Sequence, residues 1–166
     1  MRAAVFALVL LAGCSGQGTQ SNNGRATDDL ESAAIAAGVI ADPKSVDITG
    51  LYSRGTDQLC IVPSATAWSA GVTIDYGDNQ SCSGQAKLTR SGETLRFSFD
   101  EAPGCAVDAR FEGDRIVFPG QVPDACQRLC SRRASIAALD VERQSDTAAE
   151  AASLRDAKGK LLCQAG

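Results

Sequence analysis

The chain has 166 residues, a formal net charge of −4 and no histidine. Its mild acidity argues against a nucleic-acid partner, which would require a basic face. The lack of histidine removes the commonest general base and metal ligand. We therefore expect no nucleic-acid binding, no histidine-based catalysis, no metal site and no cofactor.

The N-terminal residues have the layout of an export signal. Arg2 precedes the apolar run Ala3–Leu11, which is too short to span a bilayer permanently. The tetrapeptide Leu11-Ala12-Gly13-Cys14 then resembles the lipobox of bacterial lipoproteins. This resemblance implies that residues 1–13 are a signal peptide and that the Cys14 thiol carries lipid, with an ordinary cleaved export signal as the alternative. Two or three acyl chains on Cys14 would hold the protein firmly in the membrane.

The same resemblance implies a place in the bacterial cell envelope. Ser15 follows Cys14 in place of the Asp that, in some bacteria, resembles an inner-membrane retention signal, which favours the outer membrane facing the periplasm. The polar run Ser15–Thr27 has little to bury and predicts a flexible tether with a reach of roughly 20 Å. We therefore divide the chain into a signal peptide (1–13), a lipidated cysteine with its tether (14–27) and one β-rich domain (28–166).

Three short helices are expected around this domain. Asp28–Ala37 has acidic residues in its first turn and is followed by Gly38, which suits the position just past a helix end. Pro123–Cys130 predicts one or two helical turns. Thr147–Ala157 is a further helix, in which Thr147 and Glu150 fit a capping box.

Between these helices the hydrophobic pattern has a period of two. Leu95, Phe97 and Phe99 alternate with polar residues, which is typical of antiparallel strands with one buried face. Ser91-Gly92 has the spacing of a two-residue hairpin. The pattern predicts a mainly β fold, an up-and-down meander curled into a small antiparallel barrel, with a two-sheet sandwich as the alternative. The predicted strands are 49–54, 57–62, 68–76, 84–90, 93–100, 105–112, 114–118 and 135–143.

Apart from Cys14, the chain has an even number of cysteines, which in an exported protein predicts up to three disulfides. A zinc site is disfavoured because there is neither a histidine nor a Cys-x-x-Cys motif. Cys126 and Cys130 would share one helix face, so each should pair with a different, distant cysteine, whereas a redox pair is the alternative. Barrel closure makes a Cys60–Cys163 bridge plausible, and the other pairings stay open. The six residues are Cys60, Cys82, Cys105, Cys126, Cys130 and Cys163.

The densest basic cluster is Arg128, Arg132 and Arg133. Guanidinium groups match carboxylates and phosphates, so these residues are the candidate anion-binding site. A solvated loop with salt bridges is the alternative interpretation.

Acidic groups offer two weaker candidates. Asp75, Asp78 and Asn79 could coordinate calcium, although a hairpin turn explains them better. Asp108 and Glu112 share a strand face and could form a catalytic carboxylate pair, although a charge-balanced strand is the simpler interpretation. We therefore expect the chain not to be an enzyme.

From Ile48 to Cys163 the layout resembles the small-barrel lipoproteins that inhibit lysozyme. The shared features are the lipobox, the tether, the barrel and a cysteine near each end of the barrel sequence. Ser81-Cys82-Ser83-Gly84 only partly matches the inhibitory loop of that family, so no functional residue is transferred. The expected function is a non-enzymatic binding or structural module of the envelope, and the alternative is an inhibitor of an envelope-attacking hydrolase such as lysozyme. The expected partners are membrane lipid and an envelope protein or anionic envelope polymer.

Overall fold

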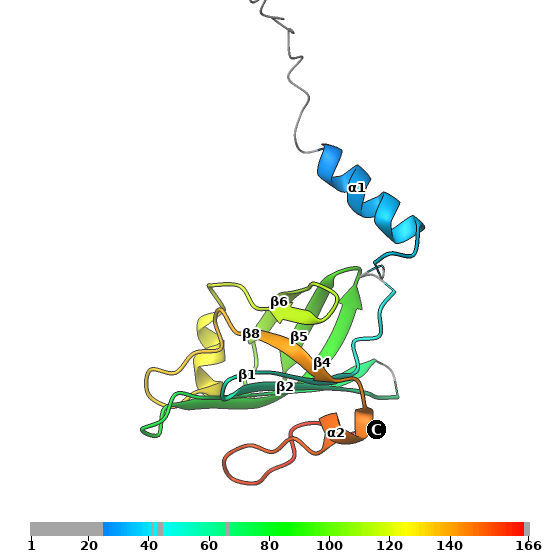
Figure 1. Cartoon of the computed structure of the whole chain (residues 1–166). Helices are drawn as coiled ribbons and strands as arrows, with labels where there is room; N and C mark the ends of the chain where they lie inside the picture. The colour runs from blue at the N-terminus through cyan, green and yellow to red at the C-terminus, as the bar shows by residue number, and fades with distance from the viewer. Residues whose placement is uncertain (1–24, 41, 43–44, 66, 165–166) are drawn as a thin grey trace, which may run out of the picture. The chain divides into compact units, whose positions relative to one another are not determined.

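The computed structural model describes residues 25–40, 42, 45–65 and 67–164 (Figure 1). Contacts divide the chain between Val39 and Ile40 into two compact units, which we describe separately. The first holds the helix α1, and the second holds all the strands. Cys14, the predicted signal peptide and most of the predicted tether lie outside the described residues.

The helix α1 spans Arg25–Ala36 and confirms the helix predicted at 28–37, with an earlier start. The final residues of the predicted tether, up to Thr27, are therefore helical. Gly38 has φ +69°, a left-handed conformation that glycine adopts easily past a helix end. None of the helices in the described part of the chain is long and apolar enough to cross a membrane.

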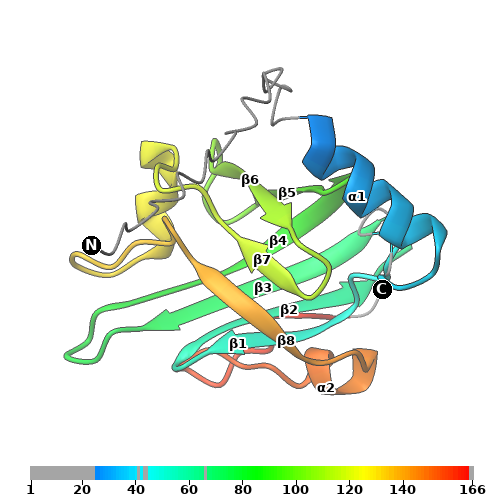
Figure 2. The same ribbon diagram turned by 45° about the horizontal axis from the view of Figure 1, so that its top comes forward.

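The second unit is a closed up-and-down barrel of antiparallel strands in the order β1 to β8, with β8 paired back to β1 (Figure 2). The predicted barrel is confirmed, rather than the two-sheet sandwich, and closure pairs the first strand with the last. The strands are β1 (Gly50–Arg54), β2 (Asp57–Pro63), β3 (Trp68–Asp75), β4 (Ser81–Ser91), β5 (Thr94–Phe99), β6 (Ala106–Phe111), β7 (Arg115–Val117) and β8 (Asp140–Ser145).

Alternate connections of such a barrel lie at the same end. The β1–β2, β3–β4, β5–β6 and β7–β8 connections share one end, which we call the η1 end. The 3₁₀ helix η1 (Asp124–Leu129), drawn in yellow in Figure 2, lies in the last of these connections. It takes the place of the helical turns predicted at 123–130.

Apolar side chains fill the barrel. The rings of Phe97 and Phe118 lie with their centroids 4.9 Å apart in this core. Leu129 of η1 packs against Gly84 of β4, where a Cβ atom would come within 2.8 Å of the leucine Cδ2. The interior is therefore a packed core, and a binding site has to be sought on the surface.

A second apolar layer covers the outer face of β2 and β3. Cys60 and Val62 point outward but are fully buried by the helix α2 (Ala148–Ala152) and the C-terminal segment. In Figure 1 α2 and the loop after it lie beside β1 and β2. Leu162 seats against Gly71 so closely that a Cβ atom on that glycine would lie 2.5 Å from the leucine Cβ. The absence of a side chain at Gly71 therefore allows the C-terminal segment to pack against β3.

The helix predicted at 147–157 is shorter than expected, and its capping box is absent. Thr147 makes no side-chain bond to the helix and instead shares a 3.1 Å hydrogen bond with Ser145. The helix ends early because Leu154 turns inward to the outer apolar layer, where its carbonyl accepts the Leu162 N–H at 3.0 Å.

Two predicted strand boundaries were wrong. β4 begins at Ser81 rather than at 84, because Cys82 faces the core although its neighbours are polar. β8 begins at Asp140 rather than at 135. Ala138 has φ +57°, a conformation that a strand does not contain, so residues 135–139 belong to the β7–β8 connection.

The cysteines form three disulfides: Cys60–Cys163, Cys82–Cys130 and Cys105–Cys126. The predicted number of bridges and the Cys60–Cys163 pairing are confirmed. Cys126 and Cys130 do pair with different distant cysteines, although Cys130 lies past the end of η1 in extended conformation.

The end of the barrel opposite η1 is closed by an aromatic and guanidinium stack. The Tyr52 hydroxyl donates to the Ile48 carbonyl at 2.9 Å, and burial raises the pKa of Tyr52 to about 12. The Arg143 guanidinium lies 5.3 Å from the Tyr52 ring and donates to the Asp47 carbonyl at 2.6 Å. These contacts tie the segment before β1 across this end.

An ion-pair network crosses the seam where the barrel closes. Asp140 of β8 accepts from Arg115 of β7 at 2.6 and 2.7 Å and from Arg54 of β1 at 2.6 Å. The hydrogen bonds from Arg115 hold the pKa of the Asp140 carboxyl below its usual value. The carboxylate therefore links three consecutive strands of the closed sheet.

Replacing Asp140 by Asn should lower the thermal midpoint at pH 7. Because the folded-state pKa is depressed, the stabilisation is present above the unfolded Asp pKa of about 4 and is lost as pH falls through the lower folded value. Melting curves should therefore show the difference between parent and Asp140→Asn narrowing below about pH 4. Asp108→Asn is the control, since its exposed pair with Arg96 should contribute little. A difference that does not change with pH would contradict this role of Asp140.

Candidate functional site

The connection between β7 and β8 is the longest in the barrel and covers residues 118–139. Connections this long are uncommon in compact domains, and ordered ones often carry function. Cys105–Cys126 ties it to the β5–β6 connection, and Cys82–Cys130 ties it to β4. The connection is thus cross-linked to the barrel at two points.

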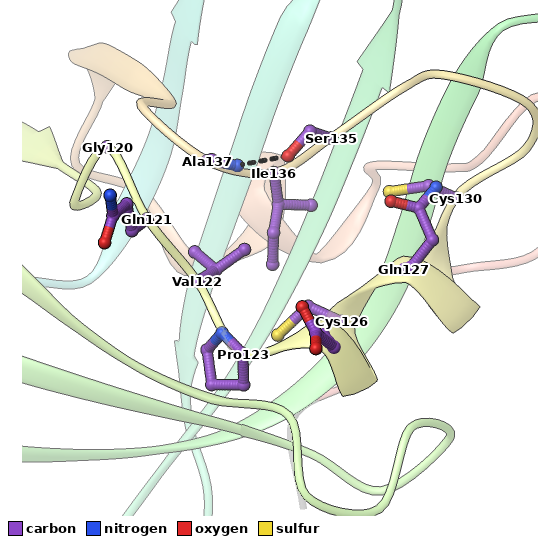
Figure 3. A pocket seen from close by; sticks show the side chains of 11 residues that line it. Gly120, Gln121, Val122, Pro123, Cys126, Gln127, Cys130, Ser135, Ile136 and Ala137 are labelled. Atoms are coloured by element: carbon purple, nitrogen blue, oxygen red, sulfur yellow. Dashed lines mark hydrogen bonds between the residues drawn. The ribbon is translucent and has the colours of Figure 1, made fainter.

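This connection forms a surface hollow of about 640 Å³, which we call the η1 pocket. In Figure 3 the side chains of Val122 and Ile136 point toward one another, with Pro123 and Cys126 nearby. Ile136 and Cys126 each expose only 1 % of their surface, so they belong both to the pocket wall and to the core. Its lining residues are Gly120, Gln121, Val122, Pro123, Asp124, Cys126, Gln127, Cys130, Ser135, Ile136 and Ala137.

Amide and hydroxyl groups surround this apolar wall. Gln127 donates through Nε2 to the Ala134 carbonyl at 3.2 Å, and the Ser135 hydroxyl accepts the Ala137 N–H at 3.0 Å. Asp124 is the one ionisable side chain among the described residues that line the pocket. The pocket therefore suits a partly apolar group that also accepts or donates hydrogen bonds.

Two non-glycine residues of the connection have left-handed backbone conformations. Arg132 has φ +55° and Ala138 has φ +57°. Such conformations cost of order 1–3 kcal/mol each and persist only where the surroundings fix them. Here the Ala138 N–H donates to the Pro119 carbonyl at 2.9 Å, which closes the connection on itself.

The β3–β4 hairpin borders the same end. Tyr76 is 57 % exposed, and its hydroxyl donates to the Ser135 carbonyl at 3.3 Å. Asp78 and Asn79 occupy left-handed turn positions, and the Asp75 carboxylate accepts the Gly77 N–H at 2.8 Å. The structure thus places the residues considered for calcium in a hairpin turn.

The arginine cluster does not line the η1 pocket. Arg128 donates to the Pro103 carbonyl and lines a second hollow, together with residues of β4 and of the segment after α2. Arg132 and Arg133 are exposed in the loop that follows. Within the described chain none of the three forms an ion pair with a carboxylate. Arg132 and Arg133 fit the solvated loop of the alternative interpretation, without its salt bridges.

Asp108 of β6 and Glu112, the residue after β6, both pair with arginines. Asp108 pairs with Arg96 of β5 at 2.9 Å, and Glu112 pairs with Arg110 at 2.5 Å. Glu112 also lies 3.6 Å from Arg115, so both carboxylates sit among arginines, as in the charge-balanced strand considered from the sequence.

The η1 pocket itself was not predicted. The sequence held one signal for it, the spacing of Cys126 and Cys130 within a segment that has no regular periodicity. That signal was used to predict disulfides, and the strand assigned to 135–143 hid the length of the connection.

Comparisons of the chain with protein-family models, with curated proteins and with solved structures gave no match. The candidate site is therefore interpreted from its own geometry.

Proposed function

We propose that the chain is a lipid-anchored envelope protein that acts as a non-enzymatic binding module and holds its partner at the η1 pocket. The observation that carries this proposal is the cross-linking of the β7–β8 connection to the barrel by two disulfides. A connection fixed in this way is preorganised, so it loses little conformational entropy when a partner binds.

Features outside the pocket support the same interpretation. Three disulfides suit an oxidising compartment such as the bacterial periplasm. The lipobox resemblance at Cys14 supplies the anchor. The η1 pocket combines an apolar wall with a few polar groups, which is the usual composition of a binding site.

The proposal predicts crosslinking that depends on the pocket in intact bacterial cells. A photo-crosslinking amino acid in place of Gln121, an exposed residue of the pocket, should give a discrete adduct. Adding Gly120→Trp should abolish the adduct, because the new side chain would crowd the pocket. Gly120 tolerates a side chain, since no atom lies within 4 Å of a Cβ placed there and its φ is ordinary.

Two controls make this experiment decisive. The same crosslinker in place of Thr94, exposed at the opposite end of the barrel, should give no such adduct. Cys14→Ser should abolish lipid attachment and remove the protein from the membrane fraction. Identical adducts from both positions, or an adduct unaffected by Gly120→Trp, would refute the pocket. A variant that still partitions with membrane after correct signal cleavage would refute the anchor.

The alternative, an inhibitor of an envelope-attacking hydrolase, is favoured by the β3–β4 hairpin. Its exposed Tyr76 is held in place by its bond to Ser135, and a rigid exposed side chain can enter an enzyme cleft. Inhibition of lysozyme by the purified protein, lost in Tyr76→Ala and retained in Gly120→Trp, would support this alternative over the first proposal.

A further inference from the structure

The second hollow, of about 460 Å³, brings together basic residues that are far apart in the sequence. Arg128 comes from η1, whereas Lys158 and Lys160 come from the turn after α2. The Ser81 and Ser83 side chains lie on the outer face of β4, which forms another wall. We call this site the cationic hollow.

Several contacts hold its walls in position. Cys82–Cys130 joins the β4 wall to the segment after η1, and Cys60–Cys163 holds the C-terminal segment on β2. The Gln85 side-chain amide donates to the Leu161 carbonyl at 2.8 Å, which ties the lysine-bearing turn to β4. The hollow is therefore built by three parts of the fold and by two covalent bonds.

The charge in the hollow is not balanced. The Lys160 ammonium pairs with Glu101, and the Asp156 carboxylate accepts the backbone N–H groups of Lys158 and Lys160 at 2.9 Å, while its charge has no side-chain partner in the described ranges of the chain. Among the described residues no carboxylate lies within 4 Å of the Arg128 or Lys158 side-chain nitrogens. The lining therefore carries three cations against the carboxylates of Glu101 and Asp156, an excess of one positive charge, and neither Arg128 nor Lys158 has a direct carboxylate partner within the described structure.

Serine hydroxyls add hydrogen-bond donors to the cations of the hollow. The Ser81 and Ser83 hydroxyls make no hydrogen bond to another residue in the part of the chain that the structure describes, so both can donate to a ligand. Ser131 is different, since its hydroxyl donates to the Asn79 carbonyl at 2.7 Å and accepts the Ser81 N–H at 3.0 Å. It fixes the wall instead of offering a free donor.

We propose that the cationic hollow binds a phosphate group carried by an envelope molecule. A guanidinium group matches phosphate oxygens, and charge-assisted hydrogen bonds from Arg128 and Lys158 would satisfy the ligand charge. Two serine hydroxyls supply donors for the remaining oxygens of a tetrahedral oxyanion. The hollow shares only Cys130 with the lining of the η1 pocket, so its phosphate binding can be tested independently of that pocket. That the phosphate comes from an envelope molecule rests on the proposed function. The phosphate could belong to a lipid headgroup or to a polymer or free ester.

Titration of the full-length protein in nonionic detergent with inorganic phosphate tests this site. Backbone amide NMR signals of Ser83 and Lys158 should shift and saturate. The double variant Arg128→Gln/Lys158→Gln should weaken binding about tenfold or more, because it removes two charge-assisted contacts. The matched control Arg132→Gln/Arg133→Gln makes the same change in net charge nearby, in residues that do not line the hollow, and should bind phosphate like the parent.

Equal weakening by both double variants would show general electrostatic attraction and would overturn the site. Absence of a saturable shift in the folded parent would also overturn it. The same NMR signals, recorded with the anchored protein in lipid nanodiscs, distinguish the possible sources of the phosphate. Phosphatidylglycerol should reproduce the phosphate-induced shifts if the ligand is a headgroup, with phosphatidylcholine nanodiscs as the baseline. If phosphatidylglycerol causes no such shifts and added glycerol phosphate does, the ligand is a soluble or polymer-borne phosphate.

Discussion

Replacing Cys60 and Cys163 together by alanine is expected to lower the free energy of unfolding by about 4.7 kcal/mol in the loop-entropy account. The bridge joins residues 103 positions apart, so its loss frees most of the unfolded chain. The variant should also release the C-terminal segment from Gly71, because the bridge and the Leu162 contact hold the same stretch. Urea unfolding of parent and variant measures the difference.

The matched control is the double alanine variant of Cys105 and Cys126. Both pairs are almost fully buried, so the loss of buried sulfur is similar. The control bridge spans only 21 positions, and the same account gives about 3.3 kcal/mol for its removal. A control that costs as much as the Cys60–Cys163 variant would show that native contacts, and not loop closure, dominate the effect of these bridges.

Gly50→Ala is expected to destabilise the barrel by about 3 kcal/mol or more, since it combines backbone strain with overpacking. Gly50 has φ +150°, and a Cβ atom there would lie 2.2 Å from the Ser145 carbonyl oxygen. This contact lies where β1 meets the end of β8, so the substitution forces apart the strands that close the sheet. Thermal and urea unfolding should both reveal the loss.

Gly120→Ala provides the comparison for this experiment. Gly120 has ordinary backbone angles and open space around a Cβ, so its substitution should change stability by less than about 0.5 kcal/mol. Equal stability of the Gly50→Ala and Gly120→Ala variants would mean that the β1–β8 junction can relax without cost.

The barrel could be predicted because its pattern is local. Residues 95–99 alternate strictly, and Gly92 marks a tight hairpin, so neighbouring strands along the chain also pair in space. Once neighbouring strands are paired in sequence order, only the pairing of the last strand with the first has to be inferred. Closure in turn made the Cys60–Cys163 bridge a reasonable prediction.

The candidate sites could not be predicted in the same way, because they depend on contacts between distant segments. No periodicity relates Val122 to Ile136, and nothing in the sequence places Lys158 beside Arg128. The arginine cluster was chosen for its density along the chain. In the fold Arg128 separates from the other two and joins lysines of the C-terminal turn.

The Cys60–Cys163 bridge also determines how the protein would carry mechanical load. A pull on the two ends of the chain passes through the disulfide and bypasses the 103-position loop that it closes. Fully extended, that loop would measure roughly 350 Å, and none of this length can be drawn out while the bridge is intact. A pull between the two chain ends would therefore act on the segment before Cys60, which includes β1 and the first residues of β2, and would leave the η1 pocket and the cationic hollow inside the unloaded loop.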